Sequence, residues 1–389
     1  MNWSEEIRLR RLIQLLGALV AFSLLITRSL WASSTRLFPK APIFDQLIEI
    51  PFSIEIVVWG ITICLAIALV FYPSKFKLIL PLIILVVLQC VFDQIRIQPW
   101  LYLYLLLLFP LWLAKNHKND KHQWLMSLVR FVVIALYFWS GIHKINPEYW
   151  DYTHEFILAP IVQKCPDDWA NFWNASGYAA PFIETVLGIL FLFKYTRNWA
   201  CVGVGFMHLV ILLCIGPFGN NWNMVVWPWN VGMMLIVWLL FYKVEWEINW
   251  RDIISGKRKY VVLVFCFFLY VAPAMNLVGL WDNYLSFSLY SGKTKSLHIY
   301  VHETAITKLE PSLQKLLQTN SNLPTFRVLM ADTWSFDELG VPVYPQRRIY
   351  MNTAQQVCGG SFLNKELFFL ITNKSGKGEI EQLRCNQLD

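Results

Sequence analysis

The residues best suited to chemistry are ionisable side chains inside or at the edge of apolar segments. His143 and Lys144 end one such segment, Glu184 lies six residues into another, and His208 is near the middle of a third. Placing such groups in a membrane is costly, so each is a candidate for function. A lysine kept dry by aromatic neighbours can act as a general base. We therefore predict Lys144, His143, Glu184 and His208 as catalytic residues. The structural alternatives are a lysine that snorkels to the headgroups, a paired carboxylate and a packing histidine.

A second group of polar residues falls in two turns between apolar segments. Asp93 and Arg96 are three residues apart and can pair on one face, with Gln98 beside them. The turn at 216–230 offers amide and indole groups that suit a quinone, a sugar or a peptide carbonyl. The predicted binding residues are Asp93, Arg96, Gln98, Asn220, Asn221, Asn223 and Trp227. A structural ion pair and a belt of interfacial tryptophans are the competing interpretations.

Membrane-spanning helices are the elements that must position these residues. The chain of 389 residues is 56% apolar, 16% aromatic and only 15% charged, which excludes a water-soluble exterior, disorder and a coiled coil. The sequence predicts an all-α polytopic membrane bundle of about nine transmembrane helices with a small C-terminal α+β extracytoplasmic domain. The expected spans are 12–31, 52–72, 78–92, 100–114, 124–143, 179–193, 199–215, 224–241 and 260–280.

The distribution of charge predicts the orientation in the membrane. Residues 282–389 carry 11 basic and 10 acidic side chains, so nearly all of the net charge of +7 belongs to the membrane part. With the N-terminus inside, 15 basic residues flank the inner ends of the spans and six flank the outer ends. We expect a cytoplasmic N-terminus, an outer C-terminal domain, a location in the bacterial inner membrane, and no nucleic-acid partner.

Two domains are expected, a transmembrane domain at 1–281 and a soluble domain at 282–389. In the second, residues 296–302, 325–330 and 366–372 read as strands and residues 310–319 as a helix. Cys358 and Cys385 are its only cysteines, and an outer compartment permits them to form a disulfide; two free thiols are the alternative. The chain has no CxxC motif, and no metal site is expected.

One segment resembles a known family. Tyr137-Phe138, Gly141, Lys144 and Asn146-Pro147 are similar to the lysine motif of the vitamin K-dependent gamma-carboxylase family. Met207-His208 resembles the later histidine segment of that family, and Glu184 falls where the family has an acidic residue. The similarity covers roughly residues 78–241. Where carboxylases proper have an Asn-His pair, this chain has Arg96-Ile-Gln98.

The resemblance implies a membrane enzyme that uses a reduced membrane quinone, menaquinol or vitamin K hydroquinone, to modify an exported peptide or protein. Lys144 would deprotonate the quinol, and the reaction would be a carbon–carbon lyase or epoxidase reaction. Two other functions stay open. One is a non-enzymatic scaffold or partner subunit for an exported protein. The other is a transporter with Glu184 and His208 as a proton relay.

Overall fold

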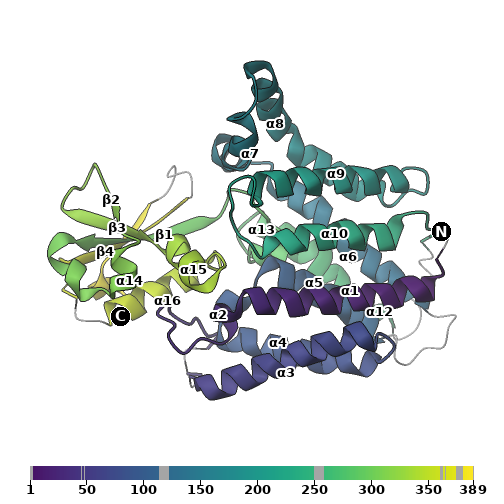
Figure 1. The fold of residues 1–389 in the computed structure, drawn as a ribbon, viewed down its shortest axis with the longest axis horizontal. Coiled ribbons are helices and arrows are strands. Elements are labelled where there is room, and N and C mark those ends of the chain that lie inside the picture. The colour runs from purple at the N-terminus through teal and green to yellow at the C-terminus, as the bar shows by residue number, and fades with distance from the viewer. Residues whose placement is uncertain are drawn as a thin grey trace.

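The protein consists of a helical bundle with a smaller sheet-containing module at one end (Figure 1). The computed structural model describes residues 3–44, 46–47, 49–113, 122–248, 258–359, 362–363, 365–373 and 380–388. The helices of the bundle are α1 (Glu5–Ile26), α2 (Arg28–Trp31), α3 (Phe52–Phe71), α4 (Ile79–Phe92), α5 (Pro99–Leu113), α6 (His122–His143), α7 (His154–Val162), α8 (Asp167–Leu190), α9 (Arg197–Ile215), α10 (Val226–Phe241), α12 (Arg258–Cys266) and α13 (Ala272–Asn276).

Within the described residues, five helices are long and apolar enough to cross a membrane, so the chain is an integral membrane protein. They are Glu5–Ile26, Phe52–Phe71, Trp124–His143, Arg197–Ile215 and Lys259–Asn276. Three further apolar helices, Phe76–Phe92, Pro99–Leu113 and Val226–Phe241, are shorter than this criterion. The expected nine crossings are therefore confirmed only in part. The predicted inner loops at 114–121 and 249–257 lie outside the described residues.

The predicted span at 179–193 is the second half of a longer helix. Helix α8 begins at Asp167 directly after Pro166, and Asp167 and Asp168 in its first turn favour that start because carboxylates offset the helix dipole. Residues 167–178 mix polar and aromatic side chains without a regular spacing, so hydropathy alone does not indicate a helix there. Helix α7 and the first half of α8 project from the side of the bundle (Figure 1).

Helix α6 is the most deeply buried of the five long apolar helices. In its most apolar stretch, 83% of the residues are buried inside the protein. It packs closely on α8 because glycines stand at the contact. A Cβ at Gly141 would lie 2.2 Å from Thr185 Oγ1, and a Cβ at Gly188 would lie 2.8 Å from the backbone nitrogen of Phe138. Any side chain at these positions would force the two helices apart.

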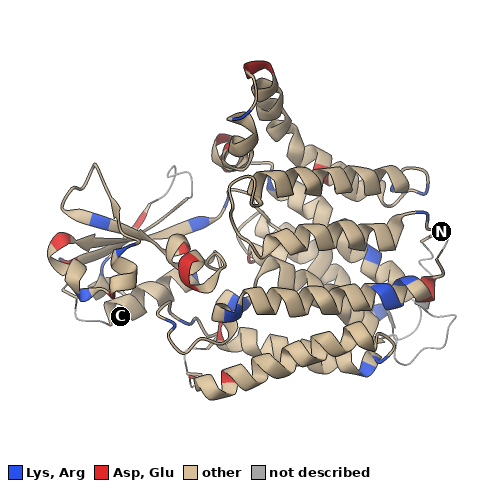
Figure 2. Ribbon diagram, in the orientation of Figure 1, with Lys and Arg blue, Asp and Glu red and all other residues tan. Residues whose placement is uncertain are grey.

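Buried arginines close the end of the bundle near the N-terminus, where Figure 2 shows several basic residues. Arg8 donates to the carbonyl of Leu239 at 2.8 Å, and Arg130 donates to the carbonyl of Leu240 at 2.9 Å and to Glu5 at 2.6 Å. These carbonyls end helix α10 and have no partner within the helix. Arg130 is therefore a structural residue that neutralises a helix terminus.

The C-terminal module is built on an antiparallel sheet in the order β2-β3-β1-β4-β5. The strands are β1 (Lys295–His302), β2 (Gln318–Thr319), β3 (Phe326–Met330), β4 (Leu367–Asn373) and β5 (Glu381–Leu383). In the central strand β1, Ile299 lies opposite Leu329 of β3 and Phe369 of β4. These three side chains are buried, as the alternation in the sequence predicts.

Two helices of the module were absent from the sequence prediction, α15 (Ala331–Leu339) and α16 (Arg347–Cys358). The predicted helix at 310–319 is confirmed only in its first turn, because α14 (Pro311–Gln314) begins at Pro311 and β2 follows it at Gln318. Cys358 at the end of α16 forms a disulfide with Cys385, 27 residues later.

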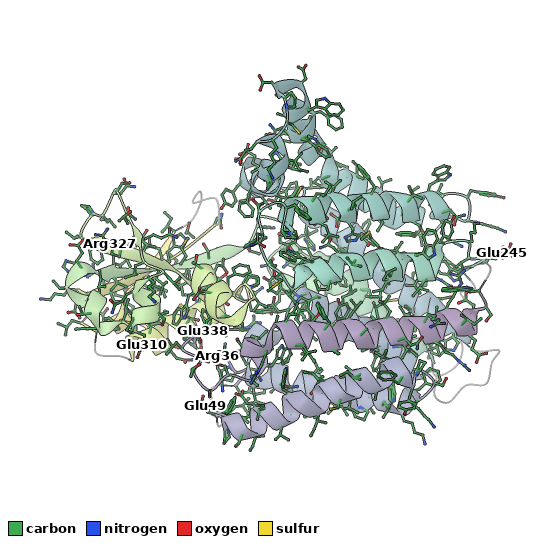
Figure 3. The ribbon with its side chains drawn as sticks, in the orientation of Figure 1. Arg36, Glu49, Glu245, Glu310, Arg327 and Glu338 are labelled. Carbon is green, nitrogen blue, oxygen red and sulfur yellow. A yellow bond between two sulfur atoms is a disulfide. The ribbon has the colours of Figure 1, made fainter. Side chains whose placement is uncertain are left out.

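The module is bonded to the bundle by several polar contacts. The Glu338 carboxylate accepts from the backbone N–H groups of Leu37 and Phe38, and Arg348 donates to the Gln94 side chain. Figure 3 shows Arg36 and Glu338 at this junction. These contacts hold the sheet in one position against the end of the helices.

Candidate functional site

A cavity of about 420 Å³ lies among helices α6, α7, α8, α9 and α10, and we call it the membrane cavity. Its lining is largely apolar. Phe172 and Ile183 of α8 and Phe206 of α9 line it and are also 56%, 51% and 63% exposed. The cavity therefore opens between α8 and α9 onto the apolar surface of the bundle.

Lys144 and Glu184 meet at the polar end of the membrane cavity. The Lys144 ammonium lies 2.6 Å from Glu184 Oε2, and it also donates to Ser140 Oγ at 2.8 Å and to the Ser140 carbonyl at 3.3 Å. The two charged side chains are only 10% and 12% exposed. Lys144 thus lies away from solvent and is paired with a carboxylate, an arrangement in which the pair as a whole is neutral.

A second polar network crosses three helices beside this pair. Asn230 donates to the Val226 carbonyl, which leaves its Oδ1 as the acceptor 2.7 Å from Nδ1 of His208. Nδ1 must then carry the proton, and Nε2 accepts from the Tyr137 hydroxyl at 2.7 Å. The tautomer of His208 is fixed by its neighbours, and all three side chains are buried.

The sequence contained a signal for part of this site that had not been used. Tyr137, Ser140 and Lys144 are spaced at i, i+3 and i+7, so they share one face of α6. This spacing indicates that Tyr137 and Ser140 belong to the site beside Lys144. The amide of Asn230 within an apolar helix is a similar indication.

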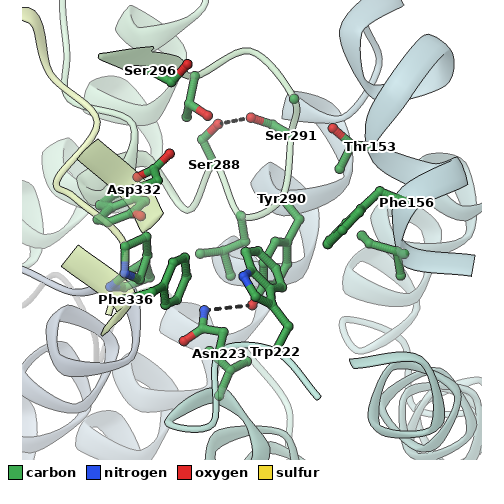
Figure 4. A pocket seen from close by; sticks show the side chains of 18 of the residues that line it. Thr153, Phe156, Trp222, Asn223, Ser288, Tyr290, Ser291, Ser296, Asp332 and Phe336 are labelled. Atoms are coloured by element: carbon green, nitrogen blue, oxygen red, sulfur yellow. Dashed lines mark hydrogen bonds between the residues drawn. The ribbon is translucent and has the colours of Figure 1, made fainter. Parts of the chain in front are cut away.

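The second cavity, of about 330 Å³, lies between the module and the end of the bundle, and we call it the rim cleft. Figure 4 shows Trp222, Phe336 and Tyr290 grouped around it. The rings of Trp222 and Phe336 are 5.4 Å apart, and those of Trp222 and Tyr290 are 5.5 Å apart. Residues far apart in the sequence thus form one aromatic wall.

Polar groups complete the rim cleft. Asn223 donates to the Tyr290 hydroxyl at 3.2 Å, while its buried Oδ1 has no partner among the described residues (Figure 4). Burial lowers the pKa of His298, against the opposing effect of the Asp332 carboxylate, so its imidazole is neutral at neutral pH. The cleft therefore offers both hydrogen-bonding groups and aromatic surface.

The two cavities are neighbours. Ile157, Trp229, Leu289 and Tyr290 line both of them. The segment that carries Leu289 and Tyr290 therefore separates a cavity that faces the apolar bundle surface from a cleft beneath the module.

Asp93 and Arg96 lie elsewhere and line neither cavity. Arg96 pairs with Glu55 at 2.7 Å and lies 3.7 Å from Asp93, and Asp93 pairs with Arg36 at 2.6 Å. Arg96 also donates to backbone carbonyls, among them that of Trp31. This ion-pair cluster joins the segment after α2, helix α3 and the turn after α4, which is the arrangement that the structural alternative expects.

Of the remaining predicted binding residues, some line the rim cleft and others lie outside both cavities. Gln98 lines the rim cleft and donates to the carbonyl of Pro342, which links the bundle to the module. Asn221 and Asn223 have positive φ values of 47° and 52°, which asparagine tolerates better than most residues. Asn220 donates to Phe156, and Trp227 donates to carbonyls within its own turn. Of the four turn residues, only Asn223 faces a cavity.

His143 is separate from the polar end of the membrane cavity. Its ring stacks on Trp139 with centroids 5.6 Å apart, and its buried Nε2 has no hydrogen-bond partner among the described residues. Lys144, Glu184 and His208 are therefore the predicted catalytic residues that the fold brings to one cavity. In the part of the chain that the structure describes, no group of three His, Cys, Asp or Glu side chains is arranged to hold a metal.

A family model described as methylamine utilisation protein MauE matches residues 122–218. This stretch runs from α6 to the turn after α9, so it contains Lys144, Glu184 and His208. It covers less than half of the chain. No curated protein and no solved structure matches the sequence.

This match overturns the resemblance to gamma-carboxylases, and the prediction of a quinol-coupled, carboxylase-like enzyme is wrong. The physical reason lies in what the shared residues do. Lys144 bonds to Glu184 and His208 bonds to Tyr137, so the motif meets the needs of any helical bundle that buries polar groups. The catalytic roles of the individual residues, the quinone cofactor and the proton relay stay predictions.

Proposed function

We propose that the protein is a non-enzymatic membrane partner of an exported protein and that it holds a segment of that protein in the rim cleft. The observation that carries the proposal is the cleft itself. It lies between a membrane bundle and a module that is bonded to the bundle by polar contacts, so both parts of the chain would contact one ligand.

The chemistry of the rim cleft suits a polypeptide. The Oδ1 of Asn223 has no partner among the described residues and can accept from a backbone N–H group, and a buried acceptor gains from such a bond. Trp222, Tyr290 and Phe336 offer aromatic surface, which is typical of residues that dominate protein recognition. The cleft is too small for a folded domain, so the ligand would be an extended segment or a loop.

The setting of this function is also part of the proposal. We place the N-terminus in the cytoplasm, the module outside and the chain in a bacterial inner membrane, with nine crossings, because basic residues concentrate at the inner ends of the spans. The description of the matching family names methylamine utilisation, and we propose that the exported partner takes part in methylamine utilisation.

Growth on methylamine tests the proposal. Phe336→Asp puts a charge into the cleft, whereas Leu323→Asp changes an exposed residue of the module that does not line it. The first variant should accumulate in the membrane, fail to support growth and lower the amount of a specific exported protein. The second should behave like the unchanged protein. Normal growth with Phe336→Asp would exclude the cleft as the functional surface.

A further inference from the structure

We infer that the membrane cavity binds an uncharged lipophilic molecule that carries a hydroxyl group and enters from the bilayer between α8 and α9. The inference rests on the membrane cavity alone and does not depend on the proposed function of the rim cleft. A volume of about 420 Å³ is within the usual range of small-molecule pockets.

The route into the cavity indicates a lipid source. The residues at its mouth, Phe172, Ile183 and Phe206, are apolar and exposed on the bundle surface. In a membrane such a surface is covered by acyl chains, so the molecules that reach the mouth are lipophilic. Gly203 of α9 lies against Leu187 in the lining, and a Cβ at this position would lie 2.7 Å from Leu187 Cδ2, so a larger side chain there must displace Leu187 or enter the cavity.

The charges in the lining indicate an uncharged ligand. Lys144 and Glu184 are the ammonium and the carboxylate of the lining, which also holds the imidazoles of His154 and His208, and the ammonium and the carboxylate already pair with each other at 2.6 Å. An anionic headgroup would have to compete with Glu184 for the ammonium, and a cationic one would have to compete with Lys144. Either would leave one charge unpaired in a poorly hydrated site, which is costly.

The unused hydrogen-bonding capacity indicates a donor on the ligand. The three N–H groups of Lys144 are taken by Ser140 Oγ, the Ser140 carbonyl and Glu184 Oε2. Glu184 Oε1 has no bond to the described residues, and the Tyr137 oxygen donates to His208 but can still accept. These acceptors suit the proton of a hydroxyl group, and the buried Trp229 Nε1–H, which also lines the cavity and has no partner among the described residues, suits its oxygen.

A matched series of twelve-carbon compounds tests the inference with the full-length protein in phospholipid nanodiscs. Tritiated 1-dodecanol is the probe, and dodecyl methyl ether, dodecanoate and dodecylammonium compete with it. We expect saturable binding of dodecanol and competition by the ether, the anion and the cation that is at least about tenfold weaker. Equal or better competition by any of the three would overturn the assignment. Competition by a diacylglycerol and by a reduced isoprenoid quinone then distinguishes two natural sources of the hydroxyl group.

Two variants locate the bound probe. Glu184→Gln should weaken dodecanol binding about tenfold, with Glu155→Gln, at an exposed position outside the lining, as the matched control. Gly203→Leu crowds Leu187 in the lining and changes neither Lys144 nor Glu184, so it should abolish binding even if Glu184→Gln does not fold. Gly205→Leu projects from the same helix into open space and should bind normally. Undiminished binding in Gly203→Leu would exclude this cavity.

Discussion

At the scale of single residues, the interpretation of the membrane cavity depends on what the Lys144 side chain bonds to. Its position at the end of an apolar helix is compatible with a free base, a snorkelling side chain or an ion pair, and sequence alone does not separate them. The structure pairs it with Glu184, 40 residues away, and turns it toward Ser140 one helical turn earlier. The sequence indicated each polar residue, but the partner depends on how α6 and α8 pack.

This pairing predicts a strong coupling between two substitutions. Lys144→Met leaves the Glu184 carboxylate without a partner in a buried site, so it should lower the free energy of unfolding by about 3 kcal/mol. The double variant Lys144→Met with Glu184→Met should recover most of this loss, because no unpaired charge remains. Thermal unfolding in detergent measures the coupling. Additive effects would show that the ion pair does not form.

At the scale of elements, the contact between α6 and α8 positions the candidate site. Gly141 lies one turn before Lys144 and faces Thr185, the residue after Glu184. The close approach at this glycine is what allows the two charged side chains to meet. A glycine within an apolar segment gives no indication of its neighbour, so this contact was not predictable from hydropathy.

Gly141→Ala should therefore destabilise the bundle. Its Cβ would lie within 2.6 Å of backbone and side-chain atoms of α8, and such overpacking costs about 1–3 kcal/mol. Gly205→Ala in α9 is the control, since nothing lies within 4 Å of its Cβ and alanine favours a helix. The melting temperature of Gly141→Ala should fall below that of the unchanged protein, whereas that of Gly205→Ala should stay equal or rise. Equal melting temperatures would mean that α6 and α8 do not approach at Gly141.

The module should lose stability in acid through the contact between α16 and β5. A hydrogen bond from Arg347 lowers the pKa of Glu381 below its ordinary value of 4.5. The stabilisation is complete above pH 4.5 and is lost as the pH falls through the lower pKa of the folded state. Glu381→Gln should flatten this part of the stability profile, as measured by chemical unfolding between pH 3 and 6. An unchanged slope in the variant would exclude Glu381 as a source of the acid sensitivity.

The strands of the module were easier to predict than its helices. Alternating apolar residues indicated β1, β3 and β4, because a half-buried strand has a period of two. Helices α15 and α16 carry their buried residues at helical spacing, but polar residues such as Ser335 and Thr353 are among them, so apolar residues alone do not reveal either helix. Helix α7 and the first half of α8 were missed for a related reason, because exposed aromatic residues interrupt any simple hydrophobic period.

At the scale of the whole molecule, the proposed function depends on the joining of two parts that the sequence suggested separately. The expected boundary near residue 281 separates helices from the sheet, but it gave no indication of a cleft between them. The rim cleft requires Gln98 from the bundle, Tyr290 from the connecting segment and Phe336 from the module. Only the folded chain brings these three regions together.

Photo-cross-linking from the rim cleft tests the central claim most directly. p-Benzoylphenylalanine in place of Phe336 should form, in intact cells grown on methylamine, an adduct with one exported protein. The same probe in place of Leu323, an exposed residue outside the cleft, should not form that adduct. If Phe336 and Leu323 give the same adducts, or Phe336 labels only lipid, the rim cleft does not hold an exported partner.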